Sequence, residues 1–176
     1  IPPEEKELYR FGVQQGLSIA LNVVTTFVIG LVFRMVLESF LFLAVYIPLR
    51  SFAGGIHAKT ANRCYVYSSF MIIAVLLVIK FFPLGNLICS CLSFLSGIII
   101  FLLAPVEAEH KKLDEIEYVV YRKRSRIILV AEIIIQLLLS MIMPKRFIMC
   151  FSLSFVCLAT VMIVGAVKNK KNGECL

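Results

Sequence analysis

Apolar residues in this chain come in long blocks separated by short polar stretches, rather than alternating with polar residues as they do in strands. The blocks cover residues 16–33, 35–49, 65–82, 87–104, 127–143 and 147–167. A helix that crosses a bilayer needs about 20 mostly apolar residues, and most of the blocks meet or approach this length. The pattern predicts an all-α polytopic membrane protein with about six transmembrane helices.

The first two blocks leave little room for two spans. Only Arg34 interrupts the stretch from 17 to 49. This stretch therefore forms either a tight hairpin of short helices or one span with a partly inserted piece, and we favour the hairpin. Before it, the run PPEE at 2–5 resembles a helix start. Leu8 and Phe11 then line one side of a short amphipathic N-terminal helix suited to the membrane surface.

Composition supports a membrane protein and gives no sign of a second domain. Hydrophobic residues make up 60% of the 176 residues, against roughly 45–50% in soluble globular proteins, and the mean hydropathy is +0.94. The chain contains no internal repeat, so we expect a single integral membrane domain over 1–176. In the longest polar stretch, 104–126, apolar residues recur at helical spacing, which predicts an interfacial helix ending in the basic cluster Arg122–Arg126.

The positive charge of the chain gathers on one side of this topology. Fourteen of the 18 lysines and arginines lie at the two ends or in the loops that a six-span chain places on that side; the others are Arg34, Lys80, Lys145 and Arg146. Lysine and arginine collect on the cytoplasmic side of membrane proteins. We therefore expect a multi-pass protein of the cell membrane with both termini and the 50–64 loop in the cytoplasm. The same charge also suits binding of anionic lipid or of an acidic partner.

A polar stretch between two oily blocks, RSFAGGIHAKTANRC at 50–64, brings together residues with catalytic potential. A histidine that takes the proton of a cysteine is a recurrent way to activate a thiol, and His57 and Cys64 offer such a pair. On one straight helix these residues would be ~10 Å apart, so the segment must bend between them. The six cysteines match neither a disulfide framework nor a zinc motif, and we expect no metal or cofactor. On the residues alone, Cys64 is explained equally well as a nucleophile and as an ordinary loop cysteine.

Polar residues inside the apolar blocks keep other functions open. Glu38, Glu132 and Gln136 are of this kind, and ionisable groups within a membrane are functional candidates by default. Glu38 either reaches toward the membrane surface or orients His57, while Glu132 and Gln136 lie one turn apart and face the bundle interior. These residues would serve a transporter or channel. The basic loops alone would serve a non-catalytic membrane adaptor.

The motif R-x-x-x-G-G-x-H-x(6)-C, formed by Arg50, Gly54, Gly55, His57 and Cys64, resembles the signature of the accessory gene regulator protein B (AgrB) family. The stretch YRFGVQQGL at 9–17 and the Ala104–Pro105 pair are similar to this family too. The resemblance implies a membrane cysteine endopeptidase of Gram-positive quorum sensing, working as a homodimer. Such an enzyme cuts an AgrD-type precursor peptide and helps to close its middle into a thiolactone or lactone ring. The resemblance makes Cys64 the nucleophile and His57 its base, and it makes Arg50 and Gly55 important for activity.

Three further expectations concern the neighbours of the pair. The backbone N–H groups of Gly54 and Gly55 are candidates for an oxyanion hole. Arg50 is expected to grip carboxylates of the substrate, since the arginine fork suits bidentate binding. The basic cluster at Arg122–Arg126 is expected to hold an acidic stretch of the precursor.

Overall fold

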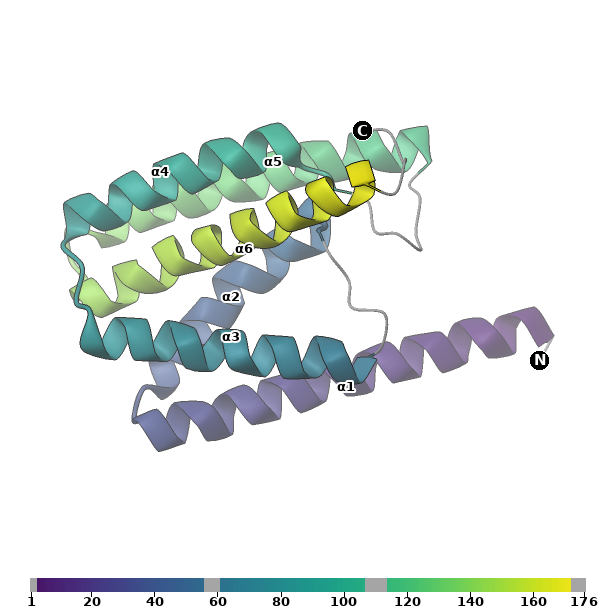
Figure 1. Cartoon of the computed structure of the whole chain (residues 1–176), viewed down its shortest axis with the longest axis horizontal. Helices are drawn as coiled ribbons and strands as arrows, with labels where there is room; N and C mark the ends of the chain where they lie inside the picture. Colours follow the sequence, from purple (N-terminus) through teal and green to yellow (C-terminus); the bar gives the residue numbers. More distant parts are fainter. Residues whose placement is uncertain (1–2, 56–60, 107–113, 172–176) are drawn as a thin grey trace.

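The structure, a computed structural model, describes residues 3–55, 61–106 and 114–171, without the side chains at 3–12, 14–15, 18–19, 61–64 and 171. This part of the chain forms six helices (Figure 1): α1 (Pro3–Phe33), α2 (Val36–Ala53), α3 (Ala61–Phe81), α4 (Asn86–Leu103), α5 (Glu115–Leu139) and α6 (Lys145–Lys171). The prediction of an all-α chain is confirmed for these residues.

Several of the helices suit a bilayer. Three are long and apolar enough to cross one: Val36–Ala53, Asn86–Leu103 and Lys145–Lys170. Two shorter apolar helices, Ala20–Phe33 and Tyr65–Phe81, add to them. The apolar part of α5 begins only after Arg126 and includes Glu132. The protein is therefore a helical multi-pass membrane protein.

The stretch 17–49 contains the reversal that the predicted hairpin requires, although α1 is 31 residues long rather than short. The chain reverses at Arg34, whose φ of 56° is left-handed, and the Met35 N–H donates to the carbonyl oxygen of Gly30 at 2.8 Å. Gly30 makes this close reversal possible, because a Cβ there would lie only 3.0 Å from the Cα of Val36 and would press on the Ser39 hydroxyl.

Two predicted short helices turn out to be parts of longer ones. The amphipathic N-terminal segment is the first part of α1, which runs unbroken to Phe33. Gly16 lies inside this helix, where a glycine lowers helix stability by about 1 kcal/mol relative to alanine but does not end the helix. The expected interfacial helix does not end at the basic cluster either. Helix α5 begins at Glu115 and carries Arg122–Arg126 onward into the apolar block. Residues 107–113, the start of that predicted helix, lie outside the described part.

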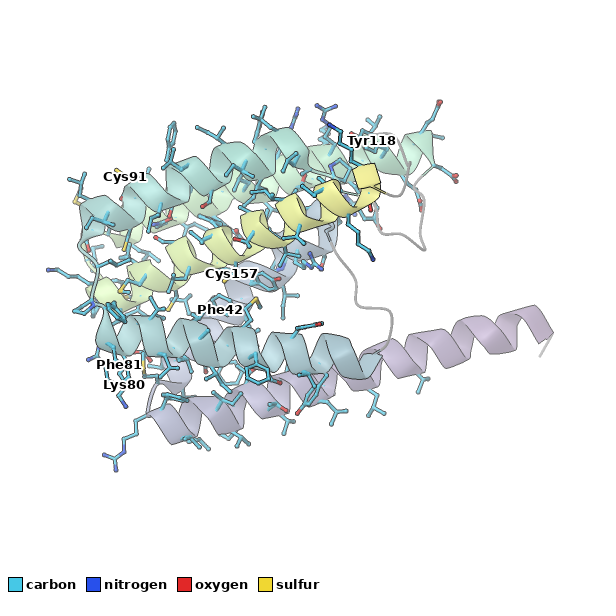
Figure 2. The ribbon with its side chains drawn as sticks, viewed as in Figure 1. Phe42, Lys80, Phe81, Cys91, Tyr118 and Cys157 are labelled. Atoms are coloured by element: carbon cyan, nitrogen blue, oxygen red, sulfur yellow. The ribbon has the colours of Figure 1, made fainter. Side chains whose placement is uncertain are left out.

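Successive helices run back and forth, so the polar connections gather at two ends (Figure 1). One end, called here the Gly54 end, holds the C-terminal ends of α2, α4 and α6 and the N-terminal ends of α3 and α5. The other, the Arg34 end, holds the α1–α2 reversal and the α3–α4 and α5–α6 connections. Lys80 lies at the Arg34 end and Tyr118 at the Gly54 end in Figure 2. Among the side chains that the structure describes, seven cations belong to the Gly54 end, against four at the Arg34 end: Arg50, Arg122, Lys123, Arg124, Arg126, Lys168 and Lys170, against Arg34, Lys80, Lys145 and Arg146.

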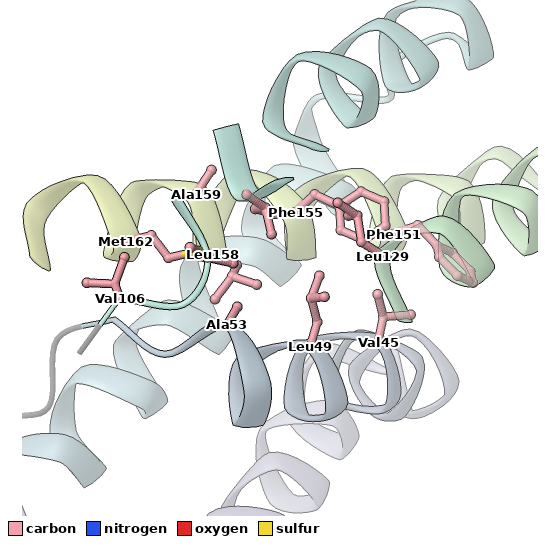
Figure 3. Close-up of a cluster of buried hydrophobic side chains, with 12 residues drawn as sticks. Val45, Leu49, Ala53, Val106, Leu129, Phe151, Phe155, Leu158, Ala159 and Met162 are labelled. Carbon is pink, nitrogen blue, oxygen red and sulfur yellow. The ribbon is translucent and has the colours of Figure 1, made fainter. Parts of the chain in front are cut away.

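Helix α6 organises the core by packing along both α2 and α4. Toward the Gly54 end, Phe155 and Leu158 of α6 meet Val45 and Leu49 of α2 and Leu129 of α5 (Figure 3). A second cluster joins α2, α3 and α6 and includes Phe42, Ile72, Leu76, Ile148 and Met149. Helix α2 thus packs against α6 from its middle turns to its C-terminal end.

A buried hydroxyl on α6 joins three helices. Ser152 Oγ donates to the carbonyl oxygen of Cys89 on α4 at 3.0 Å. It also lies 2.9 Å from Ser93 Oγ and accepts from Gln136 Nε2 of α5 at 3.1 Å. Ser152 is fully buried, so these bonds have no competition from water.

We expect Ser152→Ala to lower the free energy of unfolding by about 1–2 kcal/mol, because it strands the Gln136 amide in an apolar interior. Thr160→Val on the same helix is the control. The Thr160 hydroxyl is exposed and bonds only within α6, so its loss should change stability by less than about 0.5 kcal/mol. Denaturant unfolding in detergent micelles measures both variants. Equal effects would contradict a structural role for the Ser152 bonds.

Candidate active site

Helix α2 ends in a turn that only glycine accommodates. The N–H of Gly54 donates to the carbonyl oxygen of Arg50 at 3.2 Å and closes the last turn. Gly54 and Gly55 then take φ values of 75° and 116°, a region that side chains with a Cβ disfavour. The paired glycines of the motif therefore redirect the chain as it leaves α2.

A segment far along the chain pairs with this turn. The Val106 N–H donates to the carbonyl oxygen of Ala53 at 2.9 Å, and the Gly55 N–H donates to the carbonyl oxygen of Val106 at 3.0 Å. Gly54 and Val106 form a parallel bridge. A Cβ on Gly54 would collide with the Val106 carbonyl oxygen, so the pairing itself requires glycine there.

Arg50 completes this arrangement from the last turn of α2. Its Nη1 donates to the carbonyl oxygen of Gly54 at 2.7 Å. A Cβ on Gly55 would collide with the same Nη1, and it would lie 3.2 Å from the Val161 side chain. We call Arg50, Ala53–Gly55 and Val106 together the diglycine clasp.

The clasp rests on the core of the bundle. Ala53 is 0% and Val106 6% exposed, and both face Leu158 and Met162 of α6 in Figure 3. The backbone of the clasp is thus buried, and its N–H groups have the internal partners that burial demands. This packing makes the clasp a fixed point from which the chain continues toward His57.

The motif cysteine begins the next helix. Helix α2 ends at Ala53 and α3 begins at Ala61, so Cys64 lies in the first turn of α3. Asn62, where a break was expected, belongs to α3, and residues 56–60, where the rest of the predicted bend would lie, are outside the described part. His57 lies outside the described residues, and the Cys64 side chain is also not described. The structure therefore places the helix that carries Cys64 without testing the contact between thiol and imidazole.

The early turns of α3 are held against α1. The Tyr65 hydroxyl lies 2.6 Å from Thr25 Oγ1, and the Ser68 hydroxyl bonds to the Asn22 side-chain oxygen. These contacts fix the turn that follows Cys64. Asn22, a polar residue within an apolar block, is explained by this contact between two helices.

The N–H groups of Gly54 and Gly55, two of the candidates for the expected oxyanion hole, have hydrogen-bond acceptors within the chain. The Gly54 N–H is taken by Arg50 and the Gly55 N–H by Val106, so neither is free to bind a substrate oxygen. Sequence reasoning missed this because the acceptor on Val106 is far away in the chain. The glycines serve the geometry of the backbone instead.

The other polar candidates lie away from the clasp. Glu38 is in the first turn of α2 at the Arg34 end, about 22 Å along the helix from Ala53 at 1.5 Å per residue, so the structure does not bring it together with Arg50. Gln136 belongs to the Ser152 network, and Glu132 is buried beside it. Among the described residues, Glu132 Oε2 and Gln136 Oε1 have no hydrogen-bond partner. Both lie within the α4–α5–α6 bundle.

The remaining described cysteines belong to the bundle rather than to the Gly54 end. Cys89 and Cys150 are buried, Cys157 is half-buried and Cys91 is exposed on α4. Cys150 Sγ donates to the carbonyl oxygen of Arg146 at 3.2 Å. Cys89 and Cys91 lie near the start of α4, and Cys150 and Cys157 lie in the first half of α6 (Figure 2 labels Cys91 and Cys157). All four are therefore away from the helix ends that form the Gly54 end.

Arginines of α5 tie that helix to the Gly54 end through aromatic rings. The guanidinium carbon of Arg124 lies 5.4 Å from the ring centre of Phe52, which also meets Tyr121 at 5.7 Å. Arg126 stacks over Phe101 at 4.1 Å and donates from Nη2 to the Phe101 carbonyl oxygen at 3.3 Å. Part of the basic cluster therefore has a structural use that the sequence did not reveal.

Comparison with known proteins agrees with this arrangement. The family model described as AgrB, accessory gene regulator B, matches residues 1–163. A putative AgrB-like protein of Clostridium perfringens strain SM101 is 29% identical over 115 residues, which are 61% of this chain and 54% of that protein. Putative AgrB-like protein 2 of Clostridium perfringens strain 13 shows the same identity and coverage. The chain spans about half the length of these curated relatives, and no solved structure matches it. Because the family model covers most of the chain, the protein belongs to the AgrB family.

Proposed function

We propose that this protein is a membrane cysteine endopeptidase that cleaves an AgrD-type precursor peptide and promotes closure of a thiolactone or lactone ring for quorum sensing. Membership of the AgrB family supports the substrate class. The observation that carries the proposal is the placement of the motif. Cys64 occupies the first turn of α3, directly after the loop that leaves the diglycine clasp.

The start of a helix is a favourable place for a nucleophilic thiol. The first turn has N–H groups without intrahelical acceptors, and the helix dipole is positive there. Both features stabilise a thiolate, as they do at other reactive cysteines. Arg63, next to Cys64 in sequence, adds a cation. The location of Cys64 on α3 thus favours the ionised form that attack requires.

The proposed reaction proceeds by acyl transfer. His57 takes the proton of the Cys64 thiol, and the sulfur attacks a carbonyl carbon of the precursor. The C–N bond then breaks, the leaving amine takes the proton from His57, and the C-terminal tail departs. A thiol or hydroxyl within the acyl fragment next attacks the thioester, loses its proton to His57, and releases Cys64 as the thiol when the ring closes.

Ring closure must outrun hydrolysis of the thioester. Holding the internal nucleophile next to the thioester lowers the barrier by about 7–11 kcal/mol in well-oriented cases. A site at the end of a membrane bundle also limits access of water. The thioester conserves the acyl-transfer energy that hydrolysis would discard, so no cofactor is needed in this scheme.

The proposal includes an orientation and partners. We propose that the Gly54 end faces the cytoplasm, since most lysines and arginines gather there. Arg122 and Lys123 are exposed on α5 and are the part of the basic cluster offered to an acidic stretch of the precursor. A homodimer in the lipid bilayer is the proposed assembly, on the basis of the family.

Cys64→Ala and His57→Ala should each abolish precursor cleavage, because one removes the nucleophile and the other its base. Immunoblots of cells that express the chain and an AgrD-type precursor measure the loss. The same blots should show normal accumulation of the variants in membranes. Cys91→Ala and Cys157→Ala are matched controls and should keep substantial activity. Normal processing by Cys64→Ala would rule out the proposed peptidase.

Labelling of single cysteines tests the orientation. In a variant without native cysteines, an impermeant maleimide added from outside should reach a cysteine placed next to Pro83 or Pro144, both in connections at the Arg34 end. It should not reach cysteines that replace Ser51 or Asn172 until the membrane is permeabilised. External labelling at position 172 would contradict the proposed orientation or require an odd number of spans.

A further inference from the structure

We propose that Arg50 is a positioning residue, which holds the diglycine clasp from which the chain leaves toward His57, rather than a ligand for substrate carboxylates. The proposal depends on the proposed function, because it concerns the base of that reaction. It replaces the expectation from the sequence that the arginine fork grips the precursor.

Two hydrogen bonds of Arg50 lie within the clasp. Its backbone carbonyl accepts the Gly54 N–H at 3.2 Å, and its Nη1 donates to the Gly54 carbonyl oxygen at 2.7 Å. One residue therefore holds both hydrogen-bonding groups of Gly54. An arginine near the C-terminal end of a helix commonly bonds the last carbonyls in this way, and its charge suits the negative end of the helix dipole.

Two glycines in series need such a restraint. Glycine has the largest choice of backbone conformations, so an unsupported Gly54–Gly55 pair would leave the chain beyond it without a defined direction. Three hydrogen bonds remove that freedom: Arg50 to the Gly54 carbonyl oxygen, Gly55 to Val106, and Val106 to Ala53. His57 follows two residues after Gly55 in the sequence, so the clasp fixes the last described residues before the proposed base.

The guanidinium also occupies space that glycine leaves open. A Cβ on Gly55 would collide with Arg50 Nη1 and would lie 3.4 Å from Arg50 Cζ. The second glycine of the motif is thus explained by the arginine, as the first is explained by the Val106 carbonyl oxygen. Arg50 and Gly55 form one structural unit, and their substitutions should not act independently.

The test uses two readouts on the full chain in lipid nanodiscs. The first is the rate of Cys64 alkylation by iodoacetamide between pH 6 and 9, in a background where the other five cysteines are alanine; it needs no substrate. The second is steady-state cleavage of an AgrD-type precursor peptide. The variants are Arg50→Met, Arg50→Lys, Gly55→Ala and the double variant Arg50→Met with Gly55→Ala. His57→Ala serves as the reference for loss of the base.

If Arg50 positions the loop, Arg50→Met should lower kcat by about 10²-fold, the size of effect that a misplacement of about 1 Å produces. KM should change less than about twofold, and the alkylation profile should shift to that of His57→Ala. Arg50→Lys keeps a donor for the Gly54 carbonyl oxygen and should recover part of both losses. Gly55→Ala displaces the guanidinium without altering any charge and should give the same phenotype, with little further loss in the double variant.

Gly85→Ala is the matched glycine control. A Cβ at Gly85 meets nothing within 4 Å, so kcat, KM and the alkylation profile should stay as in the parent. Thermal unfolding of each variant in the same nanodiscs shows whether the bundle is intact. Arg50→Lys, which conserves the charge and a terminal donor, provides the comparison if Arg50→Met unfolds.

Other outcomes overturn the proposal. A raised KM with an unchanged alkylation profile in Arg50→Met and Arg50→Lys would mean that Arg50 binds substrate. Additive losses in the double variant would mean that Arg50 and Gly55 do not act as a unit. Failure of the proposed function is separate, because it is signalled by cleavage that survives Cys64→Ala. The alkylation cycle can still be read in that case.

Discussion

Irregular backbone can be buried at the end of a membrane bundle only if its polar groups find partners within the protein. The segment after α2 meets this constraint by pairing with the segment after α4. Ala53, Gly55 and Val106 exchange two backbone hydrogen bonds, and Arg50 binds the intervening carbonyl. Ala53 and Val106 also pack on α6. The segments that follow α2 and α4 are therefore held against the same helix. The turn from which the chain leaves α2 therefore depends on a contact between α2, α6 and a distant segment.

Hydropathy predicts most of the helices because each apolar block must lie in lipid or in the core. Two breaks between helices were also foreseeable, because residues at the break itself signal them. They are Arg34 at the first reversal and the glycine pair after α2. The continuation of α1 and α5 through their polar parts was missed, since a helix need not stop where its side chains change from polar to apolar. The bond from Arg50 to Gly54 spans four residues and could be inferred from helix-capping rules.

The Val106 contact had no such local signal. Its donor and acceptor are main-chain groups, which leave no trace in residue type beyond the requirement for glycine at position 54. That is why the N–H group of Gly55 was expected to be free for a substrate oxygen although it donates to Val106, whereas the Gly54 N–H is taken by the local bond to Arg50. The Ser152 network was hidden for a related reason: a serine in an apolar block reveals neither its depth nor its partners on α4 and α5.

The clasp and the start of α3 divide the proposed chemistry between two supports. Cys64 lies on α3, which is held to α1 by hydrogen bonds of Tyr65 and Ser68. The loop with His57 leaves from a turn fixed to α6 and Val106. The diglycine clasp precedes His57 in the sequence, and the start of α3 carries Cys64. Two such fixed segments suit a site that must hold a base, a nucleophile and a folded peptide together. Such placement favours intramolecular ring closure over hydrolysis.

Capture of the acyl-enzyme tests the central claim most directly. The purified chain in nanodiscs is incubated with an AgrD-type precursor whose ring-closing residue is replaced by alanine, quenched in acid and measured by intact mass spectrometry. The account predicts a mass increase equal to the precursor without its C-terminal tail, mapped to Cys64 and removed by hydroxylamine as a thioester. Release of the tail without an adduct on Cys64, or an adduct on another cysteine, would contradict it.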